Sequence, residues 1–196
     1  MAAGMRARSR RATIREVLDT ALELERKTMQ LYTALVAIFK KDDELRGFWF
    51  AMARHEAGHC GALALVESLI ENDPSLAGDR KVWFDDTTVA RLRALLSAYI
   101  KEARRGVTID RALAMALDIE GSELEDVVVE MLSLVRSPRW RERAIQLLIH
   151  DLGDLSYMVE RYTKNERLLK RADALIERHV GGLAKRRRAA ARPVRA

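Results

Sequence analysis

Two pairs of short segments in the sequence match each other at the same spacing of 95 residues. The segment ALELE at residues 21–25 recurs as ALDIE at residues 116–120, and HEAGH at residues 55–59 recurs as HDLGD at residues 150–154. The matching positions include acids and a histidine where an amphipathic helix would otherwise carry leucine. The shared offset predicts a duplicated helical hairpin, and the residue types predict that the two hairpins surround a metal site.

The composition predicts an all-α fold. The 196 residues suit one domain with tails, and 48% of them are hydrophobic, whereas only 10 are glycine and 3 are proline. Abundant alanine, leucine, glutamate and arginine favour helix, and we find no alternating apolar and polar run bounded by turn residues that would predict a strand. We therefore expect a four-helix bundle made of two helical hairpins.

Apolar positions at three- and four-residue spacing, with caps and breakers between them, set the expected helix bounds. They predict helices at about residues 12–40, 43–71, 86–105, 108–135 and 137–162, and a C-terminal helical extension that ends at Gly181-Gly182. The hairpins are residues 12–72 and 108–162, and residues 86–105 form a crossover helix capped by Asp85-Asp86-Thr87. The expected domain, residues 12–180, lies between a basic arm at residues 1–11 and a basic tail at residues 181–196.

The formal net charge of +6 is unevenly distributed along the chain. Residues 1–15 carry five arginines and no acid, and residues 182–196 carry six basic residues and no acid, so residues 16–181 total 6 − 5 − 6 = −5. Such basic ends bind nucleic acid in some proteins, but a solvated tail is the simpler interpretation. The single cysteine, Cys60, and the lack of a long apolar run predict a cytoplasmic protein with no membrane segment.

Six side chains that can bind metal lie on the predicted buried faces of the helices, at positions where apolar residues would be expected: Glu25, Glu56, His59, Glu120, Asp151 and Asp154. One buried ionised carboxylate without a partner costs several kcal/mol, and several together repel one another. Lysine and arginine are nearly absent from these faces, so the missing positive charge must come from elsewhere. Two divalent metal ions bridged by carboxylates would supply it.

These residues match the pattern of di-iron bundles, in which two helices each give one glutamate and the other two each give a Glu-x-x-His motif. The chain resembles the rubrerythrin branch of the ferritin-like superfamily, especially in ALELERKTMQLY at residues 21–32 and in HEAGH. The resemblance implies a ferritin-like four-helix bundle in which Glu25, Glu56, Glu120 and Asp151 bridge or chelate the metals. The resemblance also implies that His59 and Asp154 each complete the coordination of one metal ion and that Glu123 adds a further carboxylate ligand. It implies, too, that the bundle forms a homodimer.

By the same resemblance, the expected activity is that of a non-haem di-iron peroxidase or ferroxidase, which oxidises ferrous iron or reduces peroxide or dioxygen. Asp151 and Asp154 stand where the family has Glu-x-x-His, so the expected site is richer in negative charge. This change either favours iron or manganese or leaves the second metal position weak, occupied through water, or empty. No Cys-x-x-Cys module is present, so electrons would come from a separate donor or from iron itself. The alternative is a bundle that binds metal without turnover, or lacks metal and serves as a scaffold.

Other patterns favour ordinary packing. Residues 55–59 also satisfy the zinc-protease motif H-E-x-x-H, but neither the framing strands nor a third ligand is evident. Tyr32 and Tyr157 could act as relays near the metals, although core packing is the simpler interpretation. The tryptophans Trp49, Trp83 and Trp140 are interpreted as packing residues or interface anchors.

Overall fold

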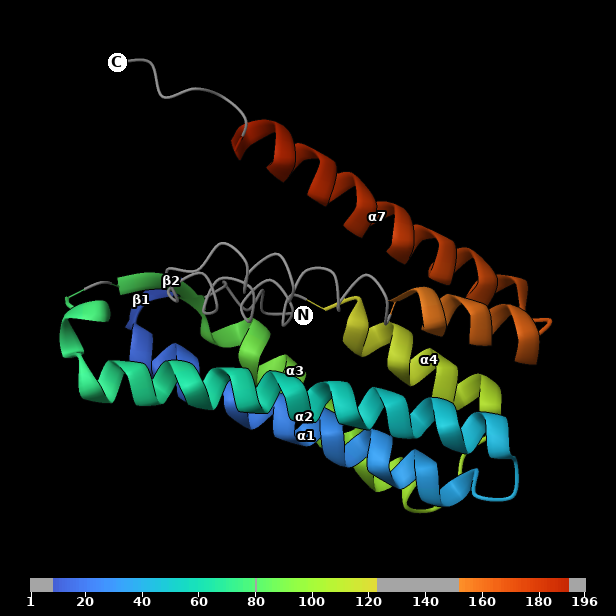
Figure 1. Cartoon of the computed structure of the whole chain (residues 1–196). Coiled ribbons are helices and arrows are strands. Elements are labelled where there is room, and N and C mark those ends of the chain that lie inside the picture. The colour runs from blue at the N-terminus through green and yellow to red at the C-terminus, as the bar shows by residue number, and fades with distance from the viewer. Residues whose placement is uncertain (1–8, 80, 123–151, 191–196) are drawn as a thin grey trace, which may run out of the picture. The chain divides into compact units, whose positions relative to one another are not determined.

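The structure is a computed structural model that describes residues 9–79, 81–122 and 152–190, with side chains described up to residue 178. Most of these residues are helical, as expected for an all-α chain (Figure 1). None of the described helices combines the length and the apolar character needed to cross a bilayer. The chain divides into two compact units: in described residues, the first comprises 9–79 and 81–107, and the second 108–122 and 152–190.

The first unit is built on a hairpin of two long helices, α1 (Ile14–Ile38) and α2 (Asp43–Asn72), which lie side by side in Figure 1. The Asp42 side chain accepts hydrogen bonds from the Glu44 and Leu45 amides and so caps α2. Both helices end within two residues of the expected bounds. Their buried faces form a core cluster together with residues before α1 and in the crossover: Ala12, Ile14, Val17, Leu18, Ala21, Leu63, Val66, Ile70 and Phe84.

Two short strands correct the expectation that the chain has none. Strand β1 (Ser9–Thr13) immediately precedes α1 and pairs antiparallel with β2 (Lys81–Asp85), with Arg11 opposite Trp83. Between α2 and β2 lies the 3₁₀ turn Pro74–Leu76. Neither strand shows an apolar and polar alternation in its own sequence, so the pairing depends on contacts between segments far apart in the chain.

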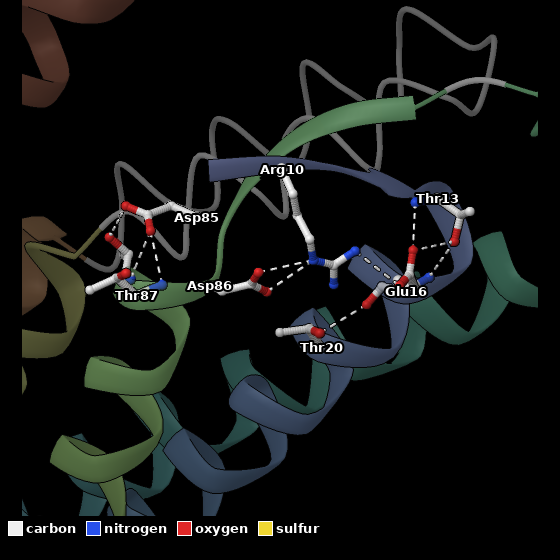
Figure 2. A network of polar contacts seen from close by, with 8 residues as sticks. Arg10, Thr13, Glu16, Thr20, Asp85, Asp86 and Thr87 are labelled. Atoms are coloured by element: carbon white, nitrogen blue, oxygen red, sulfur yellow. Dashed lines mark hydrogen bonds and ion pairs between the residues drawn. The ribbon is translucent and has the colours of Figure 1, made fainter. Parts of the chain in front are cut away.

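A network of polar contacts joins the start of α1 to the start of the helix that begins at Asp86 (Figure 2). Thr13 and Glu16 form a capping box: the Thr13 amide donates to Glu16 Oε2 at 2.8 Å, and the Glu16 amide donates to Thr13 Oγ1 at 3.2 Å. Arg10 donates to Glu16 Oε1 at 3.1 Å and to Asp86 Oδ2 at 2.9 Å, and its guanidinium lies over the Phe84 ring. The network therefore fixes β1 to both helix starts.

The expected crossover helix is confirmed as α3 (Asp86–Ala103), which packs against α1. Asp85 accepts hydrogen bonds from the Thr87 and Thr88 amides, so the predicted N-terminal cap is correct. Arg93 of α3 donates to Glu23 Oε2 of α1 at 2.6 Å and 2.9 Å, and this ion pair links the two helices on their partly exposed side.

The second unit contains α4 (Ile109–Glu120), helical residues 152–162 and α7 (Glu166–Ala190), which packs against α4. The expectation that α4 continues to about residue 135 is wrong, because α4 ends at Glu120 with Gly121 as its C-terminal cap. α7 is a separate helix that continues past Gly181-Gly182 to Ala190, so these glycines do not end it. The expected cap at Ser137-Pro138 lies outside the described residues.

Candidate metal centre

Two adjacent helices bring together three of the predicted ligands. Glu25 lies on α1, and Glu56 and His59 lie three residues apart on one face of α2. One ligand atom from each of the three side chains lies within 4.8 Å of the others. His59 Nδ1 is 3.4 Å from Glu25 Oε2 and 3.3 Å from Glu56 Oε2. We call these three residues the triad.

The triad lies inside the hairpin and not on its surface. Glu25 is 0% exposed and Glu56 is 3% exposed, and His59 is half-buried. On one side lies the apolar cluster of the first unit, which includes Leu18 and Leu63. On the other side Tyr32 and Trp49, both fully buried, stack with ring centroids 5.9 Å apart. Apolar layers therefore keep water away from the carboxylates.

The neighbours of Glu25 favour its charged form despite burial. Burial raises the pKa of the Glu25 carboxyl, but a hydrogen bond with Glu56, together with the hydrogen bond and positive charge of His59, lowers it by more. Among the described residues no lysine or arginine lies within ion-pair distance of Glu25, and its Oε1 is buried with no hydrogen-bond partner. One carboxylate oxygen of Glu25 is therefore left to bind a cation.

This donor set fits a transition metal ion. Two carboxylates and one imidazole suit iron, manganese or zinc better than calcium or magnesium, which prefer oxygen ligands alone. Ligand bonds to such ions are about 2.1 Å long, so opposite donors lie roughly 4 Å apart. The ligand atoms of the triad lie within 4.8 Å of one another, so only a small adjustment is needed to meet that geometry.

The remaining predicted ligands belong to the second half of the repeat. Glu120, the last residue of α4, is 3% exposed and is buried as expected. Asp154 is half-buried on helical residues 152–162. Glu123 and Asp151 lie outside the described residues. The relay interpretation of Tyr157 is not supported, nor is its packing in the core, because its side chain is 56% exposed.

Arginine partners of the neighbouring acids were missed in the sequence. Glu23 and Asp118 are counterparts in the repeat, each two residues before a buried glutamate. Glu23 pairs with Arg93 of α3, and Asp118 pairs with Arg171 of α7. In both units, therefore, the inner acid is buried and the outer acid pairs with an arginine from a later helix. The two arginines are 78 positions apart, outside the 95-residue offset, so the repeat gave no signal for them.

Comparison with known proteins gives no relative. No family model matches the chain, and neither a curated protein nor a solved structure matches it at a significant level. The function must therefore be argued from the triad and its surroundings.

Proposed function

We propose that this protein is a ferritin-like, non-haem dinuclear metal protein that oxidises ferrous iron or reduces peroxide or dioxygen. The observation that carries the proposal is the triad: two buried carboxylates and an imidazole converge in an apolar interior without a lysine or arginine partner for Glu25 among the described residues. A buried anionic cluster of this kind is stabilised by a cation, because desolvation makes its charge costly.

In this proposal Glu25, Glu56 and His59 hold one metal ion, and the second half of the repeat supplies the other ligands. Glu120 is the counterpart of Glu25, and its burial supports this role. Glu123, Asp151 and Asp154 are the remaining proposed ligands. Since aspartates replace the second Glu-x-x-His, the set carries extra negative charge, which favours iron or manganese.

Iron held by these residues would supply the capacity to exchange electrons with peroxide or dioxygen. The protein's own part is to bind the ions with carboxylates that are already desolvated, and to exclude bulk water with the layers above and below the triad. Glu56 and His59 can hold a cation only in their deprotonated forms, so affinity should rise with pH. Electrons come from a separate donor or from iron as the substrate.

Elemental analysis of protein purified without chelator tests the metal assignment. We expect about two equivalents of iron or manganese in the wild-type chain, and a large loss in Glu56→Ala and in Glu120→Ala. The matched control is Glu23→Ala, which removes a partly exposed acid of α1 that pairs with Arg93. This change should leave the metal content unchanged. Equal metal content in all four proteins would refute the assignment.

A metal-free scaffold is the second candidate, and one contact favours it: His59 Nδ1 lies within ion-pair distance of both carboxylates. A protonated His59 could balance one of the two charges without a metal. Turnover separates the possibilities. Rapid peroxide consumption by the reduced, metal-loaded protein supports the oxidoreductase; bound metal without turnover indicates a metal-binding protein; and no metal at all indicates the scaffold.

A further inference from the structure

The small sheet of the first unit has one face on the core and one face in solvent. Side chains alternate along a strand, so Ala12 and Phe84 point inward and are buried. The opposite side chains form what we call the outer sheet face: Ser9, Arg11 and Thr13 of β1, and Lys81, Trp83 and Asp85 of β2. The antiparallel register places Arg11 opposite Trp83 and Thr13 opposite Lys81.

Trp83 dominates the outer sheet face. It is 74% exposed, which contradicts its interpretation as a packing residue and makes it the most exposed large hydrophobic side chain among the described residues. The Arg11 guanidinium lies 6.0 Å from its ring centroid, and Arg11 Nη2 also donates to the Lys81 carbonyl at 3.3 Å. An indole held in solvent beside a cation presents a flat surface on which another planar group can stack.

The positive charge on this face is available to a partner. Neither Arg11 nor Lys81 forms an ion pair with any acid in the described parts of the chain. Arg10 differs, because Asp86 and Glu16 neutralise it (Figure 2). The one acid of the outer sheet face, Asp85, is engaged in capping α3. The segment that precedes β1 in the sequence, residues 1–8, contains two further arginines and no acid.

We propose that the outer sheet face binds single-stranded nucleic acid, with Trp83 stacked on a base and with Arg11 and Lys81 in contact with the flanking phosphates. Exposed aromatic side chains bordered by cations are how proteins bind single strands without reading sequence. An anionic membrane surface would also attract the cations, but attachment there needs several apolar side chains to enter the interface. This face has one, accompanied by the hydroxyls of Ser9 and Thr13. The proposal is independent of the metal site.

The test is fluorescence anisotropy of a labelled 20-nucleotide oligodeoxythymidine titrated with the full chain over a range of NaCl concentrations. Stacking on one base contributes about 1–3 kcal/mol, so Trp83→Ala should weaken binding by about 5- to 160-fold, while Trp83→Phe should keep most of the affinity. Each lost phosphate contact lowers the slope of log K against log salt by about 0.7. The double variant Arg11→Ala with Lys81→Ala should therefore lower the slope by about 1.4.

Arg54→Ala is the control for net charge, because Arg54 is an exposed arginine of α2; its affinity and salt slope should match wild type or show only a small general decrease. Circular dichroism of each variant checks that the fold is kept. Wild-type affinity in Trp83→Ala and in the double variant would overturn the proposal and assign any binding to the other basic segments. A loss in Arg54→Ala equal to that in the double variant would overturn it too. So would variants that lose binding to anionic phosphatidylglycerol vesicles but not to the oligonucleotide.

Discussion

Glu23 and Glu25 lie two positions apart on α1 and have opposite environments. Glu25 is fully buried in the triad, whereas Glu23 reaches the edge of the hairpin and meets Arg93 and Lys27. The apolar periodicity of α1 was sufficient to predict that Glu25 points inward and that Glu23 does not. It did not predict Arg93, because that residue comes from a helix whose position on α1 the sequence does not reveal.

The Glu23 ion pair gives a pH-dependent prediction. The hydrogen bond from Arg93 lowers the pKa of Glu23 below its ordinary value of 4.5, more than burial raises it. A lowered folded-state pKa means that the pair stabilises the fold above pH 4.5 and loses this effect as the pH falls through the folded-state pKa. Both side chains are partly exposed, so the stabilisation is about 0.2–1 kcal/mol.

Urea unfolding of wild type and Glu23→Gln should therefore show a difference in free energy of unfolding at pH 7 that shrinks toward zero near pH 3. Glu177→Gln is the control, because the exposed Glu177 of α7 has no ion pair among the described residues. A difference for Glu23→Gln that stays constant between pH 7 and pH 3 would show that the ion pair is not its origin.

At the scale of elements, the first turn of α1 combines a helix cap with the strand that precedes it. The Thr13 hydroxyl and the Glu16 carboxylate satisfy amides that the helix leaves open, and Arg10 extends the same network to α3 (Figure 2). Hydrogen bonds from the Thr13 amide and hydroxyl lower the pKa of Glu16, which keeps this carboxylate charged.

Thr13→Ala should lower the free energy of unfolding by about 1 kcal/mol, the usual cost of a lost cap. Thr33→Ala provides the matched control, because Thr33 is an exposed residue inside α1 whose hydroxyl donates only to the Met29 carbonyl. Alanine is the better helix former there, so this change should raise stability by up to about 0.7 kcal/mol. Thermal or urea unfolding measures both, and a loss of equal size in the two variants would contradict the capping role.

Helix existence and starts could be predicted from local signals, whereas several ends and both strands could not. Helix caps are short-range features: the predicted cap at Asp85 is confirmed, and Thr108 caps α4 in the same way. α4 ends at Glu120 directly before Gly121, whereas α7 continues through Gly181-Gly182, so glycine alone does not predict where a helix ends. Strands β1 and β2 pair across the whole α1–α2 hairpin, so no local window contains their signal.

At the scale of the whole molecule, the segments that match at a spacing of 95 residues also have similar side-chain environments. Each unit has a buried inner acid, Glu25 or Glu120, and an outer acid paired with an arginine. The periodicity predicted the convergence of Glu25 with Glu56 and His59, because three- and four-residue spacing fixes a helix face. The juxtaposition of Trp83 with Arg11 was not predictable, since only long-range pairing creates it.

The most direct test of the central claim is X-ray absorption at the iron edge of iron-reconstituted protein. The triad predicts oxygen and nitrogen ligands at about 2.0–2.2 Å and an outer-shell imidazole signal that disappears in His59→Ala while Glu23→Gln keeps it. An iron spectrum without imidazole, or one that His59→Ala leaves unchanged, would contradict the account.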